Sequence, residues 1–115
     1  MVDRGANGGI LGDDARVILE HQRKVDVTGI DNHQINSLKM VDASAKVTTQ
    51  RGDVILIMRQ YAYFGQNRTI HSAGQIEFYK NKVDDRSIRV GGTQCIRTVE
   101  GYVIPMDIIN GLPYI

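Results

Sequence analysis

The thirty residues 54-VILIMRQYAYFGQNRTIHSAGQIEFYKNKV-83 change from a β pattern to a helical pattern within one continuous stretch. Residues 54–58 are apolar at every position, which predicts a strand that is buried on both faces. Further along, Ser72 and Gln75 have the spacing of a capping box, in which the serine accepts a backbone N–H and the glutamine reaches back. Apolar residues then recur at helical spacing, so we predict one short helix over residues 73–83.

The chain before this stretch consists of short apolar runs separated by turn residues. The run ARVILE (15–20) is compact and apolar, and VDVTGIDNHQI (25–35) alternates apolar and polar residues on both sides of a turn. This alternation predicts a β-hairpin with an exposed tip. A second turn, at Arg51-Gly52, is predicted to join the strand over AKVTTQ (45–50) to the apolar strand that follows it.

In the last third of the chain, turn dipeptides recur at the most regular intervals. In residues 87–115, the dipeptides Gly91-Gly92, Glu100-Gly101 and Asn110-Gly111 each signal a tight turn. They separate three short β runs and the beginning of a fourth, which together predict a β-meander. Pro105 indicates that its strand has an edge or an irregular point, because proline cannot donate to a central ladder. The predicted fold class is therefore mainly β, with one short helix.

Composition limits the classes of partner. The chain has 115 residues, enough for one compact domain, and its 14 basic and 13 acidic residues give a net charge of +1. This balance gives no argument for a nucleic-acid or membrane partner. No apolar run approaches the roughly 18 residues of a membrane-spanning helix. The single cysteine, Cys95, excludes an internal disulfide and fits a reducing compartment.

Metal and phosphate sites are not predicted. His21, His33, His71 and Cys95 match no ligand spacing, so the histidines are interpreted as surface or turn residues, and neither a metal nor a cofactor is expected. The glycine-rich segment 5-GANGGILG-12 lacks the lysine and the strand-to-helix setting of a phosphate-binding loop.

The segment Asp3-Arg4-Gly5-Ala6 resembles the active-site turn of aspartic proteases. Two carboxyl groups held close together share one proton, so that one activates a water molecule while the other holds the proton for the scissile carbonyl. A glycine after the acid lets the backbone turn tightly. Taken alone the motif is weak, because an aspartate before a glycine is ordinarily only a turn.

The surrounding sequence strengthens this interpretation. Over almost its whole length, the chain resembles the retropepsin-like region of copia-type retrotransposon polyproteins, especially the divergent elements of diatoms and related algae. The segments that carry the resemblance are VDRGANGGILGDD (2–14), VDVTGIDNHQIN (25–36), VILIMRQYAYFGQNRTIHSAGQIEFYKN (54–81) and EGYVIPMDIINGLPYI (100–115). The long central segment is the most specific of them.

The resemblance implies a small closed β-barrel with one short helix. Residues 1–86 would form the retropepsin-like domain, truncated at its N-terminus, and residues 87–115 an accessory β-meander that leads to the rest of the polyprotein. It also implies a homodimer in which each chain supplies one catalytic aspartate. Asp3 would fill this role, and Arg4, Gly5 and Ala6 would form its turn.

The same resemblance implies the surroundings of the site. Gly29, Ile30, Asp31, Asn32 and His33 would form a flap that covers the bound peptide and excludes water. The strand that packs near the active-site loop would contain Ile70 and Ser72. The expected substrate is a peptide segment of the element's own polyprotein, in the cytoplasm within a retroelement particle, with no cofactor, metal, direct nucleic-acid contact or membrane.

Arg4 departs from the family pattern, which has threonine or serine at this position. A hydroxyl both donates and accepts across the dimer, whereas a guanidinium only donates. Two arginines near the two-fold axis would repel one another, and each would favour the ionised form of Asp3. Arg4 could instead turn outward to solvent and pair with an acid such as Asp13 or Asp14. Two alternatives to a protease therefore stay open: a catalytically inactive structural or dimerising module, and an unrelated small β binding domain.

Overall fold

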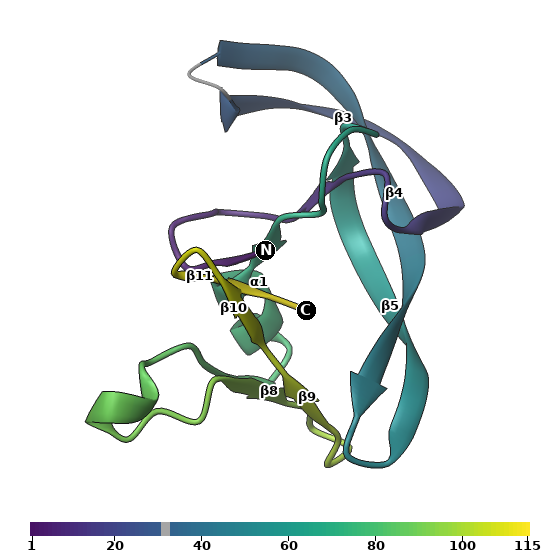
Figure 1. Ribbon diagram of the computed structural model, residues 1–115. Helices are drawn as coiled ribbons and strands as arrows, with labels where there is room; N and C mark the ends of the chain where they lie inside the picture. The colour runs from purple at the N-terminus through teal and green to yellow at the C-terminus, as the bar shows by residue number, and fades with distance from the viewer. Residues whose placement is uncertain (31–32) are drawn as a thin grey trace.

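The computed structural model of the chain describes residues 1–30 and 33–115, without the side chains of residues 29–33 (Figure 1). The strands are β1 (Val2–Asp3), β2 (Ile10–Leu11), β3 (Arg16–Ile30), β4 (His33–Thr49), β5 (Gly52–Tyr63), β6 (His71–Ser72), β7 (Lys82–Asp84), β8 (Cys95–Arg97), β9 (Val103–Pro105), β10 (Asp107–Ile109) and β11 (Leu112–Tyr114). The helical elements are α1 (Ala73–Phe78) and a short 3-10 helix, η1 (Ile88–Val90). The fold is therefore mainly β with one short α-helix, as the sequence predicts.

Two long antiparallel hairpins form the largest sheet, whose strand order is β2-β5-β4-β3. Strand β4 pairs with β3 on one side and with β5 on the other, so both predicted hairpins are present. The β4–β5 turn closes with Thr49 opposite Gly52. In the first hairpin, Ile30 pairs with His33, while Asp31 and Asn32 of the predicted tip lie outside the described residues.

The N-terminal segment threads between distant parts of the chain. Strand β1 pairs in parallel with β6, which places Val2 opposite His71 and Asp3 opposite Ser72. Strand β2 then pairs in parallel with the last two residues of β5, and its Ile10 also bridges Ile70. The loop between β1 and β2 is consequently fixed at both ends.

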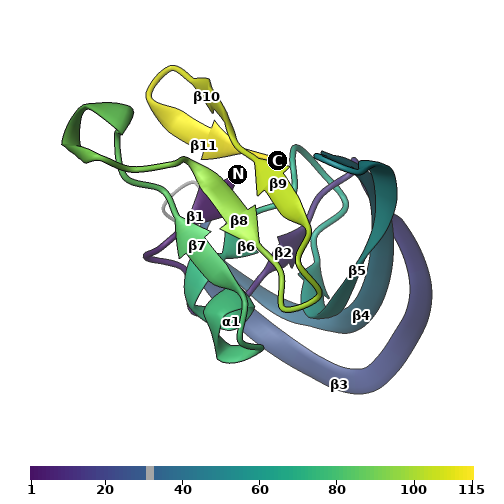
Figure 2. The same cartoon turned by 90° about the horizontal axis from the view of Figure 1, so that it is seen from below.

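The sheets do not close into the barrel that the resemblance implies. Closure requires both edge strands of a sheet to find hydrogen-bonding partners. Among the described residues, β3 forms one open edge, and β2 covers the opposite edge only beside Ala62 and Tyr63. Figure 2 shows the β3–β5 sheet curving along one side of the molecule, with α1 and the β7–β9 sheet on the other.

The prediction that residues 54–58 are buried on both faces is wrong. Along β5 the side chains of Ile55 and Ile57 are 63% and 45% exposed, whereas Leu56 and Met58 pack inward. The sheet is covered on one face only. Side chains along β5 therefore alternate between exposed and inward-facing positions, although the sequence is apolar at every position.

The helix is shorter than predicted, ending at Phe78 instead of residue 83. The Ser72 side chain accepts a hydrogen bond from the Gln75 N–H at 3.1 Å, as a capping box requires. The Gln75 side chain, however, does not reach back but binds the Gly9 N–H and the carbonyl of Arg59 on β5. Lys80 adopts a left-handed conformation (φ 67°), and Val83 enters the core from β7, so the chain leaves the helix early.

The C-terminal part differs from the predicted meander at two points. The β run predicted over residues 102–109 is divided into β9 and β10, which belong to separate sheets. Strands β7, β8 and β9 form an antiparallel sheet, and β10–β11 form a hairpin across Asn110-Gly111. Pro105 lies on β9, an edge strand of its sheet, as predicted. Residues 88–90, predicted as a strand, form η1 instead, because Ser87 caps this turn and Gly91 ends it with φ 84°.

Two apolar clusters fill the interior. The first contains Val2, Val47, Ala73, Val83, Ile96, Ile104 and Met106, and the second contains Leu11, Val41, Ala43, Met58 and Tyr61. The first cluster takes side chains from both sides of the boundary predicted between residues 86 and 87. The sheet β7-β8-β9 also spans this boundary, so the C-terminal meander shares a core with the rest of the chain.

A buried carboxylate stabilises an irregular point between β4 and β5. Two residues of β5, Arg59 and Gln60, lie opposite the single residue Asp42, and Gln60 adopts a left-handed conformation (φ 59°). Asp42 accepts hydrogen bonds from the Gln60 N–H at 2.9 Å and from His21 Nε2 at 2.8 Å. Burial alone would raise the pKa of Asp42, but these hydrogen bonds and the nearby Arg59 charge hold that pKa below its ordinary value.

Replacing Asp42 with alanine is expected to lower the free energy of unfolding by about 2 kcal/mol at pH 7, because the partly buried hydrogen bonds from the Gln60 N–H and His21 Nε2 lose their acceptor. Urea denaturation would measure this loss. The matched control is Asp53→Ala, since Asp53 is exposed and its partners among the described residues are Thr48 and Lys46; a change of about 0.5 kcal/mol or less is expected. Equal losses in the two variants would contradict a special role for Asp42.

Candidate functional site

Asp3 is half-buried at the end of β1, where the chain makes a tight turn. Its Oδ1 accepts a hydrogen bond from the Gly5 N–H at 2.8 Å, and its carbonyl oxygen accepts from the Ala6 N–H at 3.4 Å. A local aspartate turn of this kind orients the carboxylate by means of the backbone itself. In the described part of the chain, Oδ2 makes no hydrogen bond, so one carboxylate oxygen is held and the other is available.

Helix α1 and strand β5 hold the loop that follows Asp3. The Ser72 hydroxyl donates to the carbonyl oxygen of Ala6 at 2.7 Å, and the Gly9 N–H donates to Gln75 Oε1 at 2.9 Å. The Gly9 carbonyl accepts from the Ala62 N–H at 3.0 Å. Gln75 also donates to the carbonyl of Arg59 at 2.8 Å, which ties α1 to β5. The loop is thus part of the packed structure rather than a free terminal segment.

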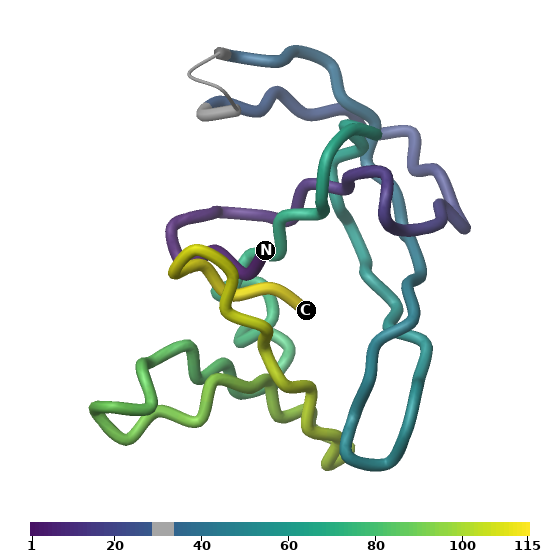
Figure 3. Tube along the Cα trace, in the orientation of Figure 1, coloured from purple at the N-terminus to yellow at the C-terminus, as the bar shows by residue number. Residues whose placement is uncertain are grey.

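This loop forms one wall of a cavity of about 620 Å³. The opposite wall is the β3–β4 hairpin, through residues 25–28 of β3 and Met40 of β4. Gln60, Ala62 and Ile70 complete the lining. Figure 3 shows the β3–β4 hairpin and the purple N-terminal loop extending to the same side of the molecule.

The structure brings several of the predicted site residues together. Asp3, Gly5, Ala6 and Ile70 all line the cavity. Ser72 lies behind the wall, where its hydroxyl holds the loop through Ala6.

Only part of the predicted flap lies within the described residues. Gly29, Ile30 and His33 belong to the two strands of the hairpin, and nothing is described of their side chains. Asp31 and Asn32 lie outside the described residues. The hairpin meets the cavity through residues 25–28, which precede the predicted flap residues.

Arg4 points away from the cavity and pairs with acidic side chains, as one alternative predicts, but its partners are Glu77 and Asp85 rather than Asp13 or Asp14. Its guanidinium contacts Glu77 Oε1 at 2.8 Å and Asp85 Oδ2 at 3.3 Å, and it donates to the carbonyl of Val83 at 3.2 Å. Asp14 is instead held by the N–H and hydroxyl of Thr69. The parallel pairing of β1 with β6 carries residue 4 towards α1, a long-range effect that local sequence does not show.

Sequence reasoning missed Asp26, which lines the same cavity as Asp3. Its Oδ1 accepts a hydrogen bond from the Ser37 N–H at 2.9 Å across the hairpin. The sequence signal at Asp26 was the alternation of polar and apolar residues along residues 25–35, which marks a strand but not a site. It could not show that residues 3 and 26 share one cavity, because the curvature of the β3–β4 hairpin decides this.

The interpretation of His71 as a surface or turn residue is also wrong, because the residue is only 5% exposed. Its Nδ1 lies 2.8 Å from the Tyr61 hydroxyl, and the two rings meet edge to face. Burial, reinforced by the charge of the Met1 amino group, lowers the pKa of His71 to about 4. His71 is therefore neutral at pH 7. Nothing in its sequence neighbourhood predicted this burial, which follows from pairing between β6 and β1.

Across residues 1–30 and 33–115, no group of three or more histidine, cysteine, aspartate or glutamate side chains is arranged to hold a metal ion. Cys95 is buried, and its sulfur contacts the hydroxyl of Thr93 at 3.2 Å. Within the same residues, no helix has the length and apolar character needed to cross a membrane.

Comparisons of the chain with protein-family models, with curated proteins and with solved structures each gave no match.

Proposed function

We propose that this chain is an aspartic endopeptidase-like domain that supplies one half of a two-chain active site. The observation that carries the proposal is the position of Asp3, on a tight, hydrogen-bonded turn in the wall of a cavity faced by a long hairpin. The resemblance of residues 2–14 and 54–81 to the retropepsin-like region of copia-type polyproteins supports the same assignment.

The proposed chemistry needs a second carboxyl group, supplied by Asp3 of another copy of the chain. Two carboxyls at the two-fold axis share a single proton, because two adjacent negative charges are unfavourable. The ionised group removes a proton from a water molecule, whose oxygen attacks the peptide carbonyl, while the other carboxyl protonates the carbonyl oxygen. Asp3 suits this role because Gly5 orients Oδ1 and leaves Oδ2 available.

Arg4 helps to hold the Asp3 loop within one chain. The hydroxyl that would lock two loops together across the axis is absent, but within one chain the loop is already fixed through Ala6, Gly9 and Arg4 itself. The Arg4 charge is directed towards Glu77 and Asp85 instead of towards the cavity. The loop therefore keeps its shape before two chains meet, and pairing has only to bring the carboxyl groups together.

The proposed substrates are peptide segments of the parent polyprotein. An extended peptide would lie between the Asp3 loop and the β3–β4 hairpin, whose side chains at Val25, Val27 and Met40 provide apolar surface. Closing a hairpin over a substrate excludes water from the reacting bond and strengthens the electrostatic effect of the carboxyls.

Hydrolysis of a diverse peptide mixture, followed by mass spectrometry at pH 4 to 7, would test the proposal. We expect cleavage by the unchanged chain and none by Asp3→Asn, which keeps the size of the side chain but removes its charge. The matched control is Asp13→Asn, because Asp13 is an exposed acid in the same segment that does not line the cavity. Cleavage that persists in Asp3→Asn, or no cleavage by the unchanged chain, would contradict the assignment.

A second candidate is a catalytically inactive dimerising module, and the observation that favours it is the arginine at position 4 in place of a hydroxyl residue. Sedimentation velocity over a range of protein concentrations separates the two functions. A dimer without cleavage at any pH supports the inactive module. Cleavage that rises with the dimer fraction supports the shared active site, and cleavage by a strict monomer excludes it.

A further inference from the structure

The sequence contains an asparagine followed by a glycine at two places, Asn7-Gly8 and Asn110-Gly111. Asparagine side chains are chemically labile. A following glycine promotes their loss of ammonia, because its backbone nitrogen attacks the side-chain carbonyl carbon without hindrance from a Cβ atom. The attack also requires the backbone at the asparagine to rotate, so the local structure decides which of the two pairs reacts.

Asn7 and Gly8 are both exposed in the loop that follows β1. In the part of the chain that the structure describes, neither residue forms a hydrogen bond through its backbone or its side chain. The Gly8 nitrogen therefore gives up no acceptor when it attacks, and the Asn7 side chain leaves no partner when it rotates. Exposed segments with few hydrogen bonds change conformation at little cost.

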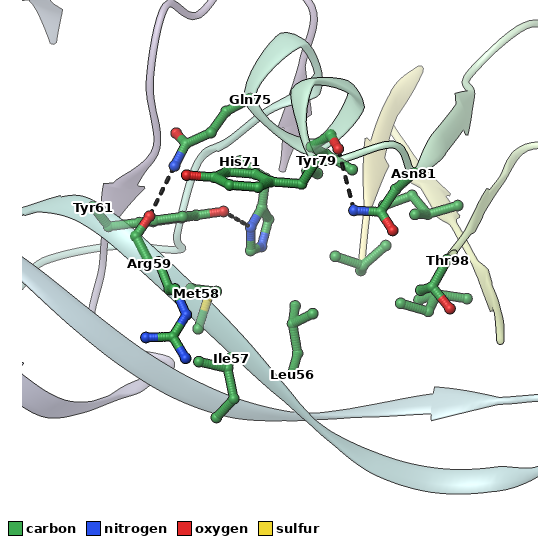
Figure 4. A pocket seen from close by; sticks show the side chains of 14 residues that line it. Leu56, Ile57, Met58, Arg59, Tyr61, His71, Gln75, Tyr79, Asn81 and Thr98 are labelled. Atoms are coloured by element: carbon green, nitrogen blue, oxygen red, sulfur yellow. Dashed lines mark hydrogen bonds between the residues drawn. The ribbon is translucent and has the colours of Figure 1, made fainter. Parts of the chain in front are cut away.

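The neighbours of this pair are anchored, so the loop keeps its place while the pair changes conformation. The Ala6 carbonyl accepts a hydrogen bond from the Ser72 hydroxyl, and the Gly9 N–H donates to Gln75 Oε1. Figure 4 shows the Gln75 side chain reaching from α1 to the carbonyl oxygen of Arg59 on β5, so this anchor is itself fixed. The reaction at Asn7 therefore does not require the surrounding fold to open.

Asn110-Gly111 has a different setting, because it forms the two-residue turn of the β10–β11 hairpin. Both residues adopt left-handed conformations, with φ 51° and 79°, as such hairpin turns require. Ile109 and Leu112 pair directly beside the turn. Rotation of Asn110 out of this conformation would disrupt the turn, which opposes the attack. The structure thus distinguishes two pairs that are alike in sequence.

We propose that Asn7 is a site of spontaneous deamidation in the folded chain, with water as the co-reactant. The Gly8 nitrogen forms a bond to Cγ of Asn7 and loses its proton, while the C–N bond of the side-chain amide breaks and ammonia leaves. Water then opens the resulting five-membered ring at one of its two carbonyl carbons. Opening at Cγ gives aspartate and opening at the backbone carbon gives isoaspartate, so both products carry one new carboxylate.

The new charge appears in a cavity wall that is already acidic. Asn7 lines the cavity together with Asp3 and Asp26, and no basic side chain is among the described lining residues. Deamidation therefore converts a neutral part of this wall into a third negative charge. The reaction needs only Asn7, Gly8 and water, so the inference stands whether or not Asp3 is catalytic.

Side-chain ¹H–¹⁵N spectra of the unchanged chain, recorded during incubation at neutral pH, follow each asparagine amide separately. We expect the Asn7 amide signal to disappear while the Asn110 signal persists. Peptide mass spectrometry should then find aspartate and isoaspartate at position 7. In urea-unfolded chain the two signals should disappear at similar rates, because only the shared Asn-Gly chemistry remains.

Gly8→Ala is the matched variant. A Cβ atom at Gly8 would have Gln75 Oε1, at 3.7 Å, as its nearest heavy atom, so the loop accepts the methyl group. The same methyl group hinders the attacking nitrogen. We expect Asn7 to react at least about tenfold more slowly, which corresponds to a barrier higher by about 1.4 kcal/mol. The Asn110 rate in this variant should not change.

Three results would overturn the proposal: an Asn7 signal that persists in the folded chain while urea-unfolded chain reacts, an Asn110 rate in the folded chain that equals or exceeds that of Asn7, or an Asn7 rate that Gly8→Ala leaves unchanged. The last result would indicate direct hydrolysis of the amide instead of attack by the Gly8 nitrogen. The time course of the unchanged chain decides the matter even if the variant does not fold.

Discussion

Replacing Gly12 with alanine is expected to destabilise the fold by about 3 kcal/mol, a large share of the stability of a small domain. A Cβ atom at Gly12 would lie 2.0 Å from the carbonyl oxygen of Asn67 and 2.7 Å from the carbonyl carbon of Arg68. Both are backbone atoms, so no side-chain rotation can relieve the contact. The approach is also held by hydrogen bonds, from the Gly12 N–H to Thr69 and from the Asp13 N–H to Asn67.

The control for this substitution is Gly8→Ala, in the same glycine-rich segment. The nearest heavy atom to a Cβ at Gly8 is Gln75 Oε1 at 3.7 Å, an ordinary contact. The free energy of unfolding of the Gly8→Ala variant should differ from that of the unchanged chain by about 0.5 kcal/mol or less. Urea denaturation of both variants makes the comparison. Equal stability of the two variants would show that the segment around Asn67 moves aside freely, contrary to its packing in the structure.

Acidification is expected to destabilise the folded chain by about 3 kcal/mol between pH 6.5 and pH 4 through His71 alone. Burial lowers the pKa of His71 to about 4, against about 6.5 in an unfolded chain. Over this interval the unfolded state binds a proton that the folded state does not. The contribution to stability is therefore complete above pH 6.5 and is lost as the pH falls towards 4.

The two charged groups around His71 act on its pKa in opposite directions, and burial outweighs the effect of Asp14. The Met1 amino group lowers the pKa of His71, Asp14 raises it, and burial is the largest cause. Urea denaturation at pH 7.5, 5.5 and 4 would measure the slope, with the Tyr61→Phe, His71→Leu double variant as the comparison. The double variant should lose less stability over this range. Parallel curves for the two proteins would assign the acid sensitivity to other groups, such as Asp42, whose lowered pKa acts below about pH 4.

Local sequence was sufficient for most of the strands and turns. Alternation in residues 25–35 and the Asn110-Gly111 dipeptide predicted two hairpins that the structure contains, because hairpin geometry depends on a few adjacent residues. Ser72 marked the beginning of α1 for the same reason, since its cap involves residues only three positions apart.

Most of the errors arise from contacts between distant segments, whereas the wrong strand prediction at residues 88–90 has a local cause, the Ser87 cap and Gly91. The continuous apolar sequence at residues 54–58 could not reveal that one face of β5 stays exposed, because this depends on which elements cover the sheet. The end of α1 depends on Val83 joining the core through β7. The partners of Arg4 and the burial of His71 depend on the parallel pairing of β1 with β6.

For this protein, then, the sequence by itself determined a mainly β chain with one capped helix and an acidic turn at Asp3. Only the tertiary structure decided that Asp3 lies in a cavity beneath the β3–β4 hairpin, that Arg4 faces away from it, and that His71 is buried beside Tyr61. The physical reason is the separation along the chain of the residues that interact. Caps and turns are set by hydrogen bonds among neighbouring residues, whereas cavities are set by strands that meet across nearly seventy residues of chain, as Val2 and His71 do.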